Sequence, residues 1–161
     1  MTEAQLIRAS LSSSRKELSE VFPRLSDEIL SWAPAEGMRT IQGQLVEIIG
    51  TELSILEHLK GMPDRNSEEV DGALFACKSV HELKAKLDEV RSETLGHLDS
   101  LDDVGLNASA GVSEGFSDWL DLKPTPVSEL FRYIARHEAY HTGQLVSYLW
   151  ARGDNPYKWN S

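Results

Sequence analysis

The sequence has 161 residues, a formal net charge of −10 and a single cysteine, Cys77. This length fits one domain with a sizeable core, and a lone cysteine excludes an internal disulfide framework and a cysteine-rich zinc site. The acidic excess is spread along the chain without a cluster of Lys or Arg, and no stretch approaches the ~18 apolar residues of a membrane span. We therefore expect a single cytoplasmic domain over residues 1–161 with no nucleic-acid or membrane partner, because the chain also starts without a basic and apolar leader.

Two helices are predicted in the first part of the chain. Thr2 and Gln5 can form a capping box, and Pro23 marks the end of the helix that they start. Thr40 is a good N-cap for the second helix, which we expect to stop at Gly61. The apolar residues at helical spacing are Ile7, Leu11, Leu18, Val21 and Phe22 in the first segment, and Ile41, Leu45, Ile48, Ile49, Leu56 and Leu59 in the second.

Two more helices are predicted in the second part of the chain. Ser79 and Glu82 can form a capping box for the third helix. The fourth is expected to have Thr125 as N-cap and Pro126 at its first position, and to end at Gly153. The stripes are Leu83, Leu87, Val90, Thr94, His97 and Leu101 in the third segment, and Leu130, Ile134, His137, His141, Leu145 and Tyr148 in the fourth.

The segments between these helices contain many turn-forming residues. They cover residues 30–39, 62–78 and 102–123, and none shows strand-like alternation. We read them as long connections without a sheet. Four helices with one apolar stripe each predict an all-α four-helix bundle, antiparallel or with crossover connections, and connections of this length often cover functional sites.

The fourth predicted helix contains two histidines within its apolar stripe. His137 and His141 lie four residues apart, so their side chains point the same way and can present two nitrogens to one metal ion. A pair of hydrogen-bonded core or groove histidines explains the same spacing. Spacing alone leaves both interpretations open, and a third ligand would decide between them.

Two stretches of the sequence resemble the DinB-like superfamily of metalloenzymes. Residues 136–153, RHEAYHTGQLVSYLWARG, are similar to the family's last helix, with two His four positions apart, Gly-Gln and a closing Gly. Residues 40–61 open with Thr-Ile, carry Glu52 at the family's acidic position and end with Leu-Lys-Gly. In this register the family's third metal-ligand histidine is replaced by Glu47.

The resemblance implies a DinB-like four-helix bundle with one divalent metal ion on Glu47, His137 and His141. A carboxylate can replace an imidazole in a three-residue site that keeps open positions, and such ligands suit zinc, nickel or iron. Periodicity alone would place Glu47 on the surface, off the main apolar stripe. Its neighbours on that side are small, which suggests close approach of another helix or a ligand; they are Gly43, Gly50, Thr51 and Ser54.

Other polar and aromatic residues are weaker candidates for the site. We interpret His97 as a satisfied core histidine, and we place His58 too far along the helix from Glu47 to share an ion. Gln144 is a candidate hydrogen-bond donor to a metal ligand, and Cys77 is interpreted as a small buried residue and not a nucleophile. The aromatic residues that could line an apolar cavity are Trp32, Trp119 and Tyr140.

Three functions are compatible with these residues. The family resemblance implies a metal-dependent enzyme that activates water or an exogenous low-molecular-weight thiol for transfer to a small electrophile, and it also implies a homodimer. A non-catalytic, stress-related metal-binding bundle would use the same ligands. Residues 137–141 match the H-E-x-x-H motif of zinc peptidases, but no His or Glu follows His141 to complete that site.

Overall fold

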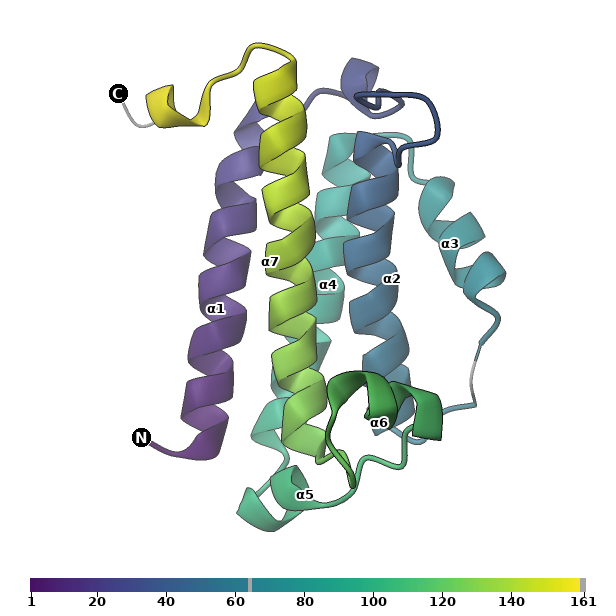
Figure 1. The fold of residues 1–161 in the computed structure, drawn as a ribbon, viewed down its shortest axis with the longest axis vertical. Helices are drawn as coiled ribbons and strands as arrows, with labels where there is room; N and C mark the ends of the chain where they lie inside the picture. The colour runs from purple at the N-terminus through teal and green to yellow at the C-terminus, as the bar shows by residue number, and fades with distance from the viewer. Residues whose placement is uncertain (64, 160–161) are drawn as a thin grey trace.

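Four long helices lie side by side in the computed structural model, which describes residues 1–63 and 65–159 (Figure 1). They are α1 (Glu3–Val21), α2 (Ile41–Leu59), α4 (Val80–Asp99) and α7 (Val127–Ala151). In Figure 1 α1 and α7 run upward from the end at which the chain begins, while α2 and α4 run downward. The chain is therefore a four-helix bundle with one crossover connection, between the parallel helices α2 and α4, and the predicted fold class is confirmed.

Three of the four predicted helix starts are confirmed. The capping boxes at Thr2 and Ser79 are both formed, and the Thr40 hydroxyl accepts a hydrogen bond from the Gly43 amide. The prediction for α7 was wrong, because its N-cap is Pro126 and not Thr125. The backbone around Thr125 pairs with residues 108–110, and its hydroxyl is turned inward to donate to the Leu122 carbonyl instead of capping the helix.

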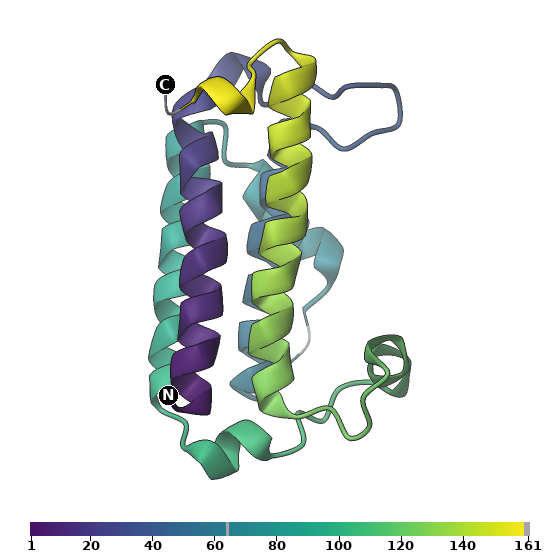
Figure 2. The same cartoon turned by 60° about the vertical axis from the view of Figure 1, so that its left-hand side comes forward.

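The long connections contain short helices that the sequence reading missed. They are α3 (Ser67–Phe75), α5 (Asp103–Asn107) and α6 (Glu114–Leu120). Three 3₁₀ turns lie outside these connections, at Phe22–Arg24, Asp27–Ile29 and Pro156–Lys158. Each of the three short α-helices starts at a side-chain cap, but five to nine residues are too few to show a clear apolar period. In Figure 2, α6 projects away from the bundle near the start of α7. Within the described part of the chain, the strand-like geometry is an isolated bridge between Ser109 and Pro126.

The apolar interior is divided into two clusters. The larger cluster includes Leu18 of α1 and Leu145 of α7, and the smaller one includes Leu11 and Phe131, which lie closer to the start of both helices. All four of these side chains are almost completely buried, and each contributes about 1.5–3 kcal/mol to folding. Charged and polar side chains occupy the layer between the clusters, at the level of the histidines of α7.

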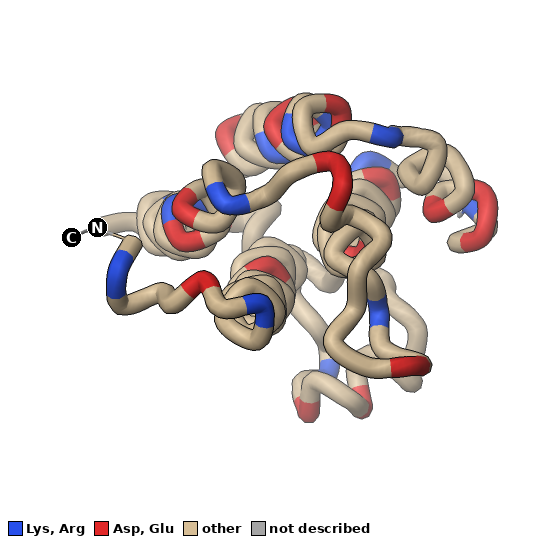
Figure 3. The backbone as a smooth tube through the Cα atoms, turned by 90° about the horizontal axis from the view of Figure 1, so that it is seen from above, with Lys and Arg blue, Asp and Glu red and all other residues tan. Residues whose placement is uncertain are grey.

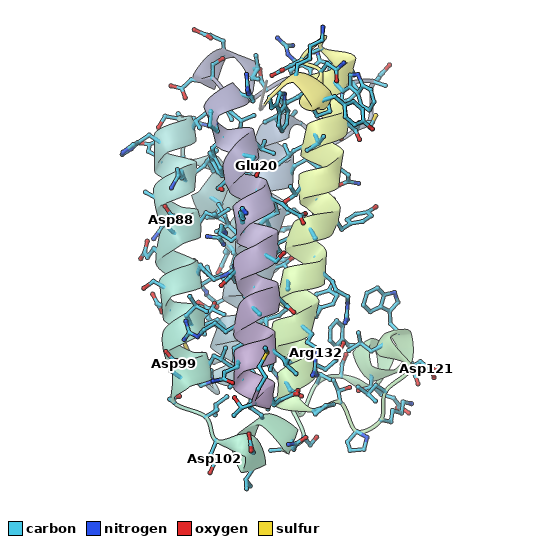
Figure 4. All side chains as sticks on the ribbon, turned by 90° about the vertical axis from the view of Figure 1, so that its left-hand side faces the viewer. Glu20, Asp88, Asp99, Asp102, Asp121 and Arg132 are labelled. Atoms are coloured by element: carbon cyan, nitrogen blue, oxygen red, sulfur yellow. The ribbon has the colours of Figure 1, made fainter. Side chains whose placement is uncertain are left out.

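Charges of both signs surround the bundle. Figure 3, a view from above, shows Lys and Arg interspersed with Asp and Glu along the described backbone. Several acidic side chains, such as Asp88 and Asp99 on the outer side of α4, project into solvent (Figure 4). Among the described helices, we find none with the length and apolar character needed to cross a membrane.

Candidate metal centre

The two histidines of α7 face the interior of the bundle, as their position in the apolar stripe predicts. His141 is 3% exposed, and the side chain of His137 is 12% exposed. Their rings lie at an angle of 62°, and the two Nε2 atoms are 3.2 Å apart. The pair therefore presents two ring nitrogens at one point.

Glu47 reaches the same point from α2. Its Oε1 lies 3.8 Å from His137 Nε2, and donor atoms of Glu47, His137 and His141 all lie within 4.8 Å of one another. The other oxygen of Glu47, Oε2, forms an ion pair with Arg39 Nη2 at a distance of 2.9 Å. The structure thus brings together the three residues that the family register selected, although periodicity alone would have left Glu47 on the surface.

Small residues beside Glu47 allow close packing, as the sequence suggested. A Cβ atom on Gly50 would lie 3.3 Å from Asp71 Oδ1 and 3.6 Å from Leu74 Cδ1, both on α3. Glycine at this position therefore lets α3 approach α2. The approaching element is a helix that the sequence reading had assigned to a connection.

A glutamine fixes the orientation of His141. The Nδ1 atom of His141 lies 2.6 Å from Gln44 Oε1, while the Gln44 amide nitrogen donates to the Tyr148 hydroxyl at 3.0 Å. Because the amide oxygen can only accept, Nδ1 carries the proton and Nε2 keeps its lone pair. Sequence reasoning missed Gln44, although it lies one turn before Glu47 and shares its side of the helix.

Both imidazoles are neutral at neutral pH. Burial lowers the pKa of His137 from its usual 6.5 to about 4, and the neighbouring His141 and Arg39 act in the same direction. Burial also lowers the pKa of His141, and the nearby Gln144 amide opposes this shift. A neutral imidazole with a free lone pair is the form that binds a metal ion.

The donor atoms fit a small divalent ion. Two nitrogens that each lie ~2.1 Å from a tetrahedral ion are separated by ~3.4 Å. The observed Nε2 separation of 3.2 Å is close to this value. The distance between Glu47 Oε1 and His137 Nε2 is 3.8 Å, and the three donor atoms together lie within 4.8 Å of one another. Glu47, whose side chain is 30% exposed, would therefore have to move towards the histidines to bind the same ion.

The other residues considered from the sequence lie outside this cluster. His58 Nε2 contacts the Ala110 carbonyl at 2.7 Å, and His97 lies against the Phe131 ring. Cys77 is half-buried and packs against the larger apolar cluster. The Oε1 atom of Gln144, the residue that the sequence suggested as a neighbour of a ligand, is buried and has no hydrogen-bond partner among the described residues. The residue bonded to the imidazole at Nδ1 is Gln44.

A buried charge layer lies on the side of α7 that faces α1 and α4. Arg91 donates to both oxygens of Glu52 at 2.7 and 3.1 Å and to Glu138 at 3.0 Å. Arg15 also contacts Glu138, at 2.9 Å, and Glu52, at 3.3 Å, and Ser14 donates to Glu138 at 2.8 Å. Burial lowers the pKa of Arg91, but its hydrogen bonds and ion pairs with the two carboxylates outweigh burial and raise it. The layer contains two positive and two negative groups and therefore balances its charge.

This layer explains the role of Glu138, the acidic residue of the H-E-x-x-H match. Its side chain is 1% exposed, and its oxygens are held by Ser14, Arg15 and Arg91. A peptidase general base must face the metal-bound water. Glu138 instead points into the bundle core, away from His137 and His141, so its role here is structural.

Comparison with known proteins places the whole site inside a family match. The family model described as the DinB superfamily matches residues 10–145, a range that includes Glu47, His137 and His141. This match agrees with the resemblance seen in the sequence. No curated protein matches the chain.

Proposed function

The chain belongs to the DinB superfamily, and we propose that it holds one divalent transition-metal ion on Glu47, His137 and His141 and acts as a metal-dependent enzyme. The observation that carries this proposal is the convergence of three donor atoms from α2 and α7 within 4.8 Å. Zinc, nickel and iron all suit two imidazoles and a carboxylate.

The surrounding residues support a site that keeps its ligands in place. Gln44 holds the His141 ring through Nδ1, and Arg39 holds the second oxygen of Glu47. Such hydrogen bonds fix the tautomer and direction of metal-binding side chains. A divalent ion bound by three protein ligands supplies a Lewis acid that lowers the pKa of a coordinated water or thiol towards neutrality.

Any thiol used in this chemistry has to come from a bound small molecule. Cys77, the only cysteine of the chain, packs against the larger apolar cluster and does not line the cavities beside the histidines. We propose transfer of an exogenous low-molecular-weight thiol, or of water, to a small electrophile. The alternative is a metal-binding bundle without turnover, which the same ligands would serve.

A transfer assay separates these alternatives. Zinc-, nickel- and iron-loaded protein is mixed with glutathione, cysteine or coenzyme A and with 1-chloro-2,4-dinitrobenzene, and formation of the carbon–sulfur bond is followed by absorbance. We expect turnover with at least one metal and thiol that a chelator abolishes and that His141→Ala lacks. Rates equal to those of His141→Ala under every condition would favour the non-catalytic alternative.

A further inference from the structure

A cavity of about 470 Å³ opens beside the candidate metal centre. His137 and His141 form part of its wall, so a molecule bound there would lie next to the ion. The remaining lining residues are aromatic or basic; they are Arg39, Trp119, Tyr133, Arg136 and Tyr140. A volume in this range suits a small organic ligand.

The charged side chains that line this cavity are two arginines. Among the described residues that line it, Arg39 and Arg136 are the charged side chains, and no carboxylate joins them. Arg39 uses one terminal nitrogen for Glu47 and Arg136 uses one for Glu129, and both side chains are about half exposed. Since a guanidinium has five N–H donors, each arginine retains donors for a ligand. The paired carboxylates, Glu47 and Glu129, lie outside the lining, so the groups that an anion in the cavity would meet are the guanidinium donors.

The remaining walls are aromatic rings. Trp119 of α6 is 67% exposed and meets the Tyr133 ring edge to face, with centroids 5.5 Å apart. Tyr140 is also largely exposed, and the centroid of its ring lies 5.1 Å from the centroid of the His141 ring. Large aromatic side chains that stay exposed around a cavity offer flat apolar surface for a ligand ring.

We infer that this cavity binds a small organic anion that joins a flat aromatic body to a carboxylate. The arginines recognise the carboxylate by charge-assisted hydrogen bonds, and Trp119 and Tyr140 contact the ring. The inference that this anion is a substrate rests on the proposed function, because the anion would then be the electrophile or co-substrate held beside the ion. As a statement about binding, it depends only on the side chains of the cavity.

Calorimetric titration with 2-naphthoate and its neutral analogue 2-naphthamide tests the inference. Both probes are titrated into chelator-treated protein and into zinc-loaded protein, and the metal-free form isolates the arginines from direct attraction by a cation. We expect 2-naphthoate to bind about tenfold more tightly than 2-naphthamide in the metal-free form, the difference of one charge-assisted hydrogen bond. Equal affinities, or no naphthoate binding at millimolar concentration, would overturn the inference.

Matched variants locate the binding. Arg136→Gln should weaken naphthoate binding about tenfold. Arg132 lies one turn away on α7 and outside the cavity, and it pairs with Glu3 and, at 3.8 Å, with the same Glu129 that Arg136 contacts (Figure 4). Arg132→Gln therefore also disturbs Glu129 and should change naphthoate binding less than about twofold. Trp119→Ala should weaken the binding of both probes. Its control is Trp150→Ala, at an exposed position of the same helix as Arg136. All four side chains are substantially exposed, so the bundle core stays intact. Equal effects of Arg136→Gln and Arg132→Gln would refute the assignment.

The same titrations keep the two proposals apart. An Arg136-dependent preference for naphthoate in a protein that binds no zinc would reject the metal proposal and support the anion cavity. One zinc ion bound per chain, together with naphthoate binding that does not change in the Arg136 and Trp119 variants, would support the metal proposal and reject the anion cavity.

Discussion

Replacing Glu138 by Gln removes one charge from the buried layer and leaves the shape of the side chain almost unchanged. Arg15 and Arg91 would then share one carboxylate, Glu52, in place of two. Breaking a buried ion pair by neutralising one partner costs about 3–5 kcal/mol. The Arg15 side chain is 17% exposed and also pairs with Asp88 at 3.6 Å, so its charge would be compensated in part. We therefore expect a loss of about 3 kcal/mol, at the lower end of this range.

For a domain of this size, that loss corresponds to a fall in melting temperature of about 6–12 °C. Thermal unfolding followed by circular dichroism in the presence of a chelator measures it. Glu20→Gln, on the exposed side of α1, is the matched control and should stay within about 0.5 kcal/mol of wild type (Figure 4). Since Glu138 points away from the candidate metal centre, Glu138→Gln should still bind one metal ion per chain.

Two results would refute this reasoning. A melting temperature for Glu138→Gln equal to that of the Glu20→Gln control would show that the charge layer does not stabilise the fold. Chelator-sensitive cleavage of unstructured peptides by wild type, lost in Glu138→Gln, would establish the H-E-x-x-H peptidase interpretation instead.

Further predictions concern the ligands and their neighbours. Glu47→His should retain one metal ion per chain, because it gives the site three imidazoles, whereas Glu47→Ala should bind zinc more weakly. Equilibrium dialysis with zinc compares the two variants. Unchanged zinc binding by Glu47→Ala would remove Glu47 from the site. Gln44→Leu should weaken zinc affinity about 10–100-fold, as is typical when a partner of a ligand histidine is lost. The pKa of His137 in the folded protein is about 4, below its usual 6.5, so the unfolded chain takes up the proton first as the pH falls. Metal-free protein should therefore lose up to about 3 kcal/mol of stability as the pH falls from about 6.5 to about 4. Urea denaturation should show a flatter pH profile for His137→Asn than for wild type. Light scattering at micromolar concentration checks the expected dimer.

The helical scaffold could be predicted because its signals are local. Capping residues and apolar spacing reach only a few positions along the chain, so Thr2, Thr40 and Ser79 marked true helix starts. Thr125 misled the prediction because pairing between residues 108–110 and 125–127 determines where its hydroxyl points. The short helices α3, α5 and α6 were missed because each shows too little periodicity of its own.

The site was only partly predictable for a related reason. His137 and His141 lie on one helix, so their spacing was enough to place them together. Glu47 lies on another helix, and its selection depended on the family register. The partners of these residues, such as Gln44 and Arg39, depend on how α2 packs against α7.

The buried charge layer could have been anticipated but was not. Arg15 lies four residues after Leu11 and three before Leu18, within the apolar stripe of α1, and Arg91 follows Leu87 by one turn on α4. A basic residue inside an apolar stripe indicates a buried acidic partner, because an unpaired charge is rarely buried. Which carboxylates would pair with these arginines could not be read from the sequence, since Glu52 and Glu138 come from two other helices.

The metal content of untagged protein tests the central claim most directly. Wild type, His141→Ala and the exposed-histidine control His81→Ala are dialysed against zinc, washed free of loosely bound ions and measured by plasma mass spectrometry. We predict one zinc ion per chain in wild type and in His81→Ala, and none in His141→Ala, with the helical circular dichroism spectrum unchanged in all three. Stoichiometric zinc in His141→Ala, or no zinc in wild type, would contradict a metal centre built on Glu47, His137 and His141.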